Sequence, residues 1–330
     1  MAGITIAARF GLAAAIVLGH AHSVWPQSDA FKSFKQLDST SKMPKLNAFS
    51  APLAAQAGPA AKDVTLQAKL TTADEETVEE GLTWRVFSPV SGADGKLPLV
   101  ASSEGGGASF QLAPGDYFVN VAFGRAGVTK KLSIPAEGDV EKQVLVLDAG
   151  GVLLDATAGS DTLVPENQLS FSIYSSEVRQ NGERGLVMAD VKPNTIVRLN
   201  AGTYHVVSEY GDVNAVVRAD IQVEAGKLVE ATLQHRAAQI TLKLVSQPGG
   251  EAIADTAWSV LTATGDIVNE SVSAFSTMVL AEGEYLAVAR NKDKIYQRSF
   301  TVAAGKNIDV EVMMKEQPNI DLFSNAELRE

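Results

Sequence analysis

Cysteine is absent from the 330-residue chain, and histidine is scarce, with only four residues. Without cysteine the chain has no disulfide framework, no thiolate metal ligand, no cysteine nucleophile and no thiol-linked lipid anchor. His20 and His22 lie near the amino terminus, and neither His205 nor His235 belongs to a closely spaced histidine pair of the kind that binds zinc. We therefore expect no metal site and no cofactor.

Basic residues are also in short supply, because 28 Lys and Arg stand against 39 Asp and Glu, a net charge of −11. A nucleic-acid binder needs a basic surface to displace counterions, so that class is excluded. The sequence contains neither a Gly-x-Ser-x-Gly elbow nor a phosphate-binding Gly-x4-Gly-Lys motif. Gly105–Gly107 precedes a predicted strand rather than a helix, which favours a mobile hairpin tip over an anion site. We expect no catalytic residues and no enzymatic activity.

Long apolar runs are confined to the amino terminus. Residues 1–23 contain one charged side chain if the histidines are neutral, Arg9, followed by an apolar run over 11–19 and by small residues suited to cleavage. This pattern predicts a signal peptide and a periplasmic or extracellular protein. Two alternatives stay open. The segment could be an uncleaved membrane anchor, because residues 4–19 are nearly as long as the about 20 apolar residues that span a membrane, or it could be a buried element of the fold.

Residues 24–62 mix Ser, Ala, Pro, Lys and Gln without a period, which predicts a flexible linker. The linker carries five lysines against two aspartates, whereas the remainder of the chain is acidic. Two interpretations are open: a solvated spacer, or peripheral contact with an anionic surface such as a membrane or peptidoglycan.

Three tandem repeats account for residues 63–315. A Leu-x-x-Gly-x-Tyr motif occurs three times, with its glycines 87 and 81 residues apart. Three aromatic residues upstream of the motifs are spaced by 87 and 87 residues: Trp84, Phe171 and Trp258. Apolar and polar residues alternate within each repeat, as in half-buried antiparallel strands. The pattern predicts an all-β protein of three β-sandwiches, at 63–149, 150–236 and 237–315, with an acidic tail at 316–330.

The Leu-x-x-Gly-x-Tyr motif predicts a structural corner. Glycine can adopt the positive φ of a turn into the next strand, and the tyrosine packs its ring in the core while its hydroxyl bonds back to the turn. The corner residues are Gly115, Tyr117, Gly202, Tyr204, Gly283 and Tyr285. The upstream aromatic residues are likewise expected in the core rather than on a carbohydrate-stacking surface.

A motif of this kind between short strands, in units of about 85 residues, resembles the carboxypeptidase regulatory-like, transthyretin-like sandwich group, which is immunoglobulin-like in architecture. The resemblance covers roughly residues 64–315 and implies an accessory or scaffold role. The whole chain is also similar to secreted proteins of alphaproteobacteria, which implies a compartment but no activity.

The loop tips that follow the corner strands are the candidate partner contacts, because loops at the end of a sandwich are natural binding positions. The candidate contact residues are Arg125, Asp212, Asn214, Lys292, Lys294, Tyr296 and Arg298. Freely varying polar tips are the alternative. The tail either docks on a partner or is a frayed end. We expect a cell-envelope module that binds or scaffolds an envelope protein, with an accessory glycan- or peptidoglycan-binding module as the alternative and a hydrolase with an unfamiliar site as a third class.

Overall fold

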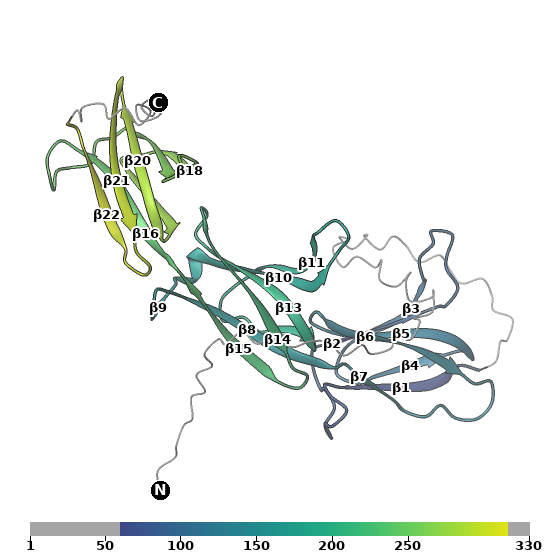
Figure 1. Ribbon diagram of the computed structural model, residues 1–330. Coiled ribbons are helices and arrows are strands. Elements are labelled where there is room, and N and C mark those ends of the chain that lie inside the picture. Colours follow the sequence, from purple (N-terminus) through teal and green to yellow (C-terminus); the bar gives the residue numbers. More distant parts are fainter. Residues whose placement is uncertain (1–59, 316–330) are drawn as a thin grey trace, which may run out of the picture. The chain divides into compact units, whose positions relative to one another are not determined.

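The computed structural model describes residues 60–315, and it is all-β (Figure 1). The regular structure of this part of the chain consists of strands and one 3-10 turn, η3 (Glu166–Gln168). The all-β class predicted from the sequence is confirmed. The predicted signal peptide at 1–23, nearly all of the predicted linker and the tail at 316–330 lie outside the described residues.

Each repeat contributes seven strands, and the second adds η3 and one short strand. The first repeat comprises β1 (Lys62–Lys69), β2 (Leu82–Phe87), β3 (Leu99–Gly105), β4 (Ala108–Leu112), β5 (Gly115–Phe123), β6 (Ala126–Ile134) and β7 (Gln143–Val146). The second comprises β8 (Ala149–Ala158), β9 (Thr162–Leu163), β10 (Leu169–Val178), β11 (Arg184–Val191), β12 (Val197–Asn200), β13 (Gly202–Tyr210), β14 (Ala215–Val223) and β15 (Leu228–His235). The third comprises β16 (Ala237–Val245), β17 (Ala257–Thr262), β18 (Ile267–Val272), β19 (Phe275–Ala281), β20 (Gly283–Asn291), β21 (Lys294–Val302) and β22 (Ile308–Met313).

The same topology recurs in all three repeats. In the first, one sheet has the order β4-β1-β7 and the other has the order β3-β2-β5-β6. The second repeat has β12-β8-β15 and β11-β10-β13-β14, and the third has β19-β16-β22 and β18-β17-β20-β21. The first and last strands of each repeat pair in parallel, and the other ladders are antiparallel. Each repeat is therefore a two-sheet sandwich in which one sheet contains a parallel pair of strands.

The aromatic residues that revealed the repeats occupy the three cores. Trp84, Phe171 and Trp258 are each at most 1% exposed. The indole N–H of Trp84 donates to the carbonyl of Gly106 at 2.8 Å, and that of Trp258 donates to the carbonyl of Ser273 at 3.0 Å. Each tryptophan thus buries its ring without leaving its polar atom unsatisfied.

Gly105–Gly107 is not a free hairpin tip. The segment crosses from β3 in one sheet to β4 in the other. A Cβ on Gly106 would lie 2.3 Å from the carbonyl oxygen of Glu79, so only glycine allows this close backbone approach. The sequence suggested a mobile tip because sheet membership is decided by tertiary contacts that a glycine run does not encode.

The corner tyrosines have matching hydrogen bonds. The hydroxyls of Tyr117, Tyr204 and Tyr285 each donate, at 2.9 Å, to the carbonyl of the residue four positions earlier. The glycines are less uniform, because Gly115 and Gly202 have φ of 152° and 150°, whereas Gly283 lies outside that range. At Gly283 the expected requirement for positive φ is therefore not met.

The connections between repeats are very short. β7 ends at Val146 and β8 begins at Ala149, whereas β15 ends at His235 and β16 begins at Ala237. β1 begins at Lys62, the last residue of the predicted linker. The short connections bring the β-hairpin tip of one repeat close to the corner of the next.

Candidate functional site

The tip between β5 and β6 contacts the second repeat. The backbone N–H of Arg125 donates to the carbonyl of Arg198 at 3.0 Å. A Cβ on Gly124, whose φ is 64°, would lie 3.0 Å from the Cβ of Arg198. The guanidinium carbon of Arg198 lies 4.4 Å from the centre of the Phe123 ring, within cation–π range. The tip that the sequence offered as an external contact is thus engaged inside the molecule.

Asn200, which lies directly before the second corner, adds side-chain hydrogen bonds to this junction. Its Oδ1 accepts the backbone N–H of Gly127 at 3.1 Å. Its Nδ2 donates to the carbonyl of Leu147 at 2.8 Å and, at 3.3 Å, to that of Gly127. One side chain therefore holds the tip of the first repeat and the connection that leads into the second.

The tip between β13 and β14 makes an equivalent contact with the third repeat, but here the asparagine that bonds across the junction, Asn214, lies on the tip itself. Asn214 accepts the backbone N–H of Ala281 at 2.9 Å through Oδ1 and donates to the hydroxyl of Tyr285 at 3.0 Å through Nδ2. A Cβ on Gly211, with φ of 67°, would lie 2.7 Å from the Cβ of Val279. Val279 in turn packs in the core of the second repeat.

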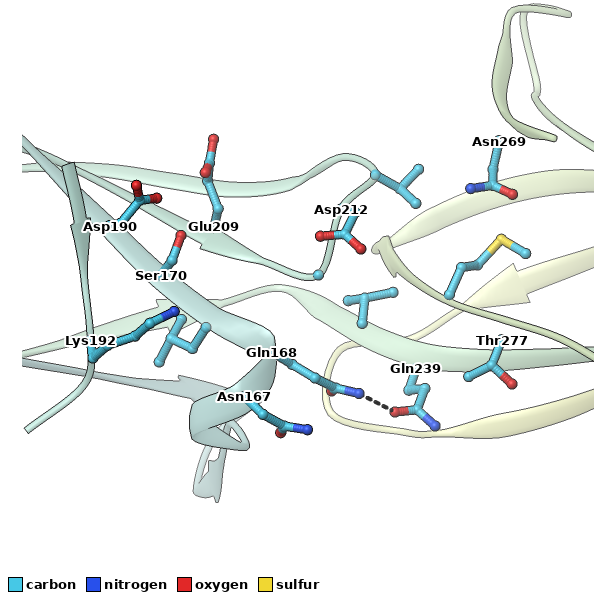
Figure 2. A pocket seen from close by; sticks show the side chains of 15 residues that line it. Asn167, Gln168, Ser170, Asp190, Lys192, Glu209, Asp212, Gln239, Asn269 and Thr277 are labelled. Atoms are coloured by element: carbon cyan, nitrogen blue, oxygen red, sulfur yellow. Dashed lines mark hydrogen bonds between the residues drawn. The ribbon is translucent and has the colours of Figure 1, made fainter. Parts of the chain in front are cut away.

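A polar cleft of about 380 Å³ lies beside this second junction (Figure 2). Nε2 of Gln168 donates to Oε1 of Gln239 at 3.1 Å, which links the two repeats. Oε1 of Gln168 is buried and has no hydrogen-bond partner among the described residues. The charged side chains of the lining are Asp190, Lys192, Glu209 and Asp212. The cleft has no aromatic residue and no paired nucleophile and base, so its chemistry suits polar contact rather than catalysis.

His235 is a buried polar residue at the same junction, and its environment was not foreseen from the sequence. Its Nε2 lies 2.8 Å from Oγ of Ser208, and both residues are 0% exposed. Nδ1 has no partner among the described residues, and the ring makes an edge contact with Tyr210 at 5.8 Å between centroids. A catalytic Ser–His pair needs substrate access and a group that orients the histidine, and neither is present in residues 60–315. The pair is structural.

Burial lowers the pKa of His235 to about 4 from an ordinary value of 6.5. The unfolded chain therefore takes up a proton at this position before the folded chain does as pH falls. Stability is fully present above pH 6.5 and decreases as pH falls from 6.5 toward 4. We expect His235 to account for a loss of about 2 kcal/mol between pH 7.5 and pH 5, measured by denaturant unfolding.

Two variants separate this effect from other titrations. His235→Gln removes the titration while an amide can still bond Ser208, so its loss between pH 7.5 and 5 should be smaller by about 2 kcal/mol. His205→Gln removes the partly exposed histidine that pairs with Asp220 at 2.7 Å and keeps His235. Its pH dependence should retain the His235 contribution. Equal losses in the wild-type chain and in His235→Gln would contradict the assignment.

The candidate contacts of the third repeat do not form one patch. Tyr296 is 5% exposed and packs in the third core, because its register partner on β20 is the inward-facing Ala289. The prediction that Tyr296 is a contact residue is therefore wrong, because its side chain is buried. Arg298 is exposed and donates to the carbonyl of Glu311 at 2.5 Å. Lys292 and Lys294 are exposed at the tip, where Lys292 has φ of 54°.

The third tip differs from the first two at its key position. Lys292 follows the last residue of β20, as Gly124 follows β5 and Gly211 follows β13. All three have positive φ, but only the two tips that touch a following repeat have glycine there. Asp212, by contrast, is exposed on a docked tip and lines the cleft.

Within residues 60–315, no three His, Asp or Glu side chains gather as metal ligands would. No helix in this part of the chain is long and apolar enough to cross a bilayer.

A family model matches part of the chain. The Rhizobiales growth-associated tandem repeat domain matches residues 239–314, within the third sandwich. This match supports tandem β-sandwich repeats, and the particular resemblance to the carboxypeptidase regulatory-like group stays a prediction. No curated protein matches the sequence significantly.

Several solved structures match the chain at low similarity. A Streptococcal ancillary pilin is 13% identical, with 78% of this chain and 100% of that chain covered and a TM-score of 0.27. BcpA, the major pilin subunit of Bacillus cereus, is 10% identical over 77% of this chain and 100% of that chain, with a TM-score of 0.21. The Bacillus anthracis TIE protein is 16% identical over 77% of this chain, with a TM-score of 0.22, and the chain spans only 51% of that protein. Likenesses of this size carry no argument about function.

Proposed function

We propose that the chain is an exported, non-enzymatic module of the cell envelope that acts as a scaffold for a protein partner. The observation that carries the proposal is the pair of repeat junctions, in which Asn200 and Asn214 bind the neighbouring repeat. Hydrogen-bonded junctions between sandwiches suit a spacer or scaffold that holds binding surfaces at fixed separations. Export rests on the signal-peptide pattern of residues 1–23.

Two features favour a protein partner over a glycan. The three aromatic residues that the repeat pattern singles out, Trp84, Phe171 and Trp258, are buried and so cannot stack on sugar rings. Exposed apolar side chains occur on an edge strand of each repeat, including Leu99 on β3, Leu186 on β11 and Ile267 on β18. Edge strands with exposed apolar residues are common sites of contact between proteins.

The proposal is tested with tagged residues 24–330 as bait in extracts of the cell envelope. We expect enrichment of a protein, with competition by excess untagged chain as the control for specificity. A parallel binding measurement uses purified muropeptides. Recovery of wall fragments alone, together with saturable muropeptide binding, would contradict the scaffold proposal and support the glycan alternative.

A further inference from the structure

A row of four paired residues, two of them exposed and apolar, crosses the outer face of the third repeat at its distal end. Register pairs place Val272 of β18 opposite Ala257, Ala257 opposite Arg290, and Arg290 opposite Ile295 of β21. Paired residues of antiparallel strands point to the same face of a sheet. Val272 is 74% exposed and Ile295 is 65% exposed. We call these four residues the distal row.

Arg290 gives the distal row a single positive charge. Its side chain is exposed, and its guanidinium has no hydrogen-bond or ion-pair partner within residues 60–315. A ligand for the row should therefore combine apolar side chains with a carboxylate.

The corresponding rows of the other repeats are different. In the second repeat, register pairs align Ser170 with Glu209 and Glu209 with Val216. Ser170 and Glu209 line the polar cleft beside the third repeat. In the first repeat, the row ends at Gly127, which bonds Asn200 of the second. Within residues 60–315 no other repeat covers the row of the third repeat, and this row is the one with two large exposed apolar side chains. The row therefore offers two exposed apolar side chains on either side of a positive charge that is unpaired within the described residues.

The chain leaves the third repeat at the same end as the distal row. β22 runs parallel to β16 with Met313 opposite Val245, and the N–H of Met314 donates to the carbonyl of Val245 at 2.9 Å. The sequence that follows, 316–330, contains four acidic residues and one arginine. Its centre reads Ile320-Asp321-Leu322-Phe323, which is apolar with one carboxylate.

The intervening chain is long enough to reach the row. The nine residues from Met313 to Leu322 span up to roughly 30 Å when extended. Passing from one sheet to the other covers about 10 Å, and crossing four strands covers about 15 Å.

We propose that residues 316–330 dock on the distal row, with Asp321 opposite Arg290 and the flanking apolar side chains against Val272 and Ile295. The tail then acts as a built-in competitor for any partner that uses this face. The proposal does not depend on the scaffold function, because both the row and the tail belong to this chain.

Because the chain contains no cysteine, introduced cysteines can form a disulfide only with each other. In the full chain, the V272C/L322C pair places one thiol on the row and one on the tail. The matched control, T301C/L322C, uses an exposed position on β21 at the opposite end of the same sheet. We expect an intramolecular disulfide to form at least ten times faster in the first pair, and Arg290→Glu to remove most of that advantage.

Mass spectrometry and gel filtration distinguish the results. A fast disulfide within one chain supports the proposal. Equal rates in the V272C/L322C and T301C/L322C chains would overturn it, as would a disulfide that forms only between copies. The purified chain alone is used, so failure here leaves the scaffold proposal untouched, and failure of the envelope pull-down leaves this one untouched.

Discussion

Replacing Trp258 with alanine is expected to destabilise the third repeat by about 3–5 kcal/mol. Trp258 is 1% exposed and lies among the buried residues of the third core. The substitution removes a large apolar surface, leaves a cavity that the two sheets cannot fill, and leaves the carbonyl of Ser273 without the indole N–H at 3.0 Å. Calorimetry of the full chain should show one transition moving to lower temperature.

Trp258→Phe is the matched control for this experiment. It keeps a buried ring and loses the hydrogen bond to Ser273, so the expected loss is smaller, about 1–2 kcal/mol. The separate cores of the first two repeats predict that their transitions move much less. A loss below about 1 kcal/mol in Trp258→Ala would mean that the residue does not fill the core as described.

The repeats and their cores could be predicted because they depend on periodic signals within the sequence. Trp84, Phe171 and Trp258 recur at a fixed spacing, and the alternation around them marks strands. The sheet partners were not predictable to the same degree. The glycine run Gly105–Gly107 predicts a hairpin tip, because nothing local shows that β3 and β4 belong to different sheets.

The junctions were missed because the residues that make them look ordinary in the sequence. In the second motif, Arg198 directly precedes the leucine and Asn200 directly follows it. In the third motif, Val279 directly precedes the leucine. A comparison of the three motifs shows that these positions vary, but variation is also what an exposed loop displays. The residue after the corner strand is the feature of the sequence that indicates a junction, because it is glycine at positions 124 and 211 but lysine at 292. That pattern distinguishes tips that touch another repeat from the one that does not.

His235 shows a related limit. The sequence places it at the end of a strand and gives no sign that it is buried beside Ser208 and Tyr210. Its burial follows from the short connection to β16, which brings the third repeat against the end of β15. Tertiary contacts, rather than strand pattern, decide its pKa.

Gly211→Ala is expected to weaken the junction between the second and third repeats by about 2–4 kcal/mol. A positive φ of 67° costs a non-glycine residue about 1 kcal/mol or more. The added Cβ would also lie 2.7 Å from the Cβ of Val279, which is close to the backbone and cannot swing aside, so overpacking adds about 1–3 kcal/mol. Denaturant unfolding measures the loss.

Gly182→Ala separates the two contributions to that loss. Gly182 has a φ of 82°, and a Cβ there would meet no atom within 4 Å. It lies in the turn between β10 and β11, so the control pays the backbone cost of about 1 kcal/mol without touching the junction. If Gly211→Ala and Gly182→Ala lose the same stability, the tip does not press on Val279 and the junction is looser than described. A larger loss in Gly211→Ala, with weaker hydrogen-exchange protection at the N–H of Ala281, identifies close packing as the reason for glycine at this tip. The same reasoning explains why Lys292, with φ of 54°, is tolerated at the corresponding position of the third repeat, where no other repeat within residues 60–315 lies against the tip.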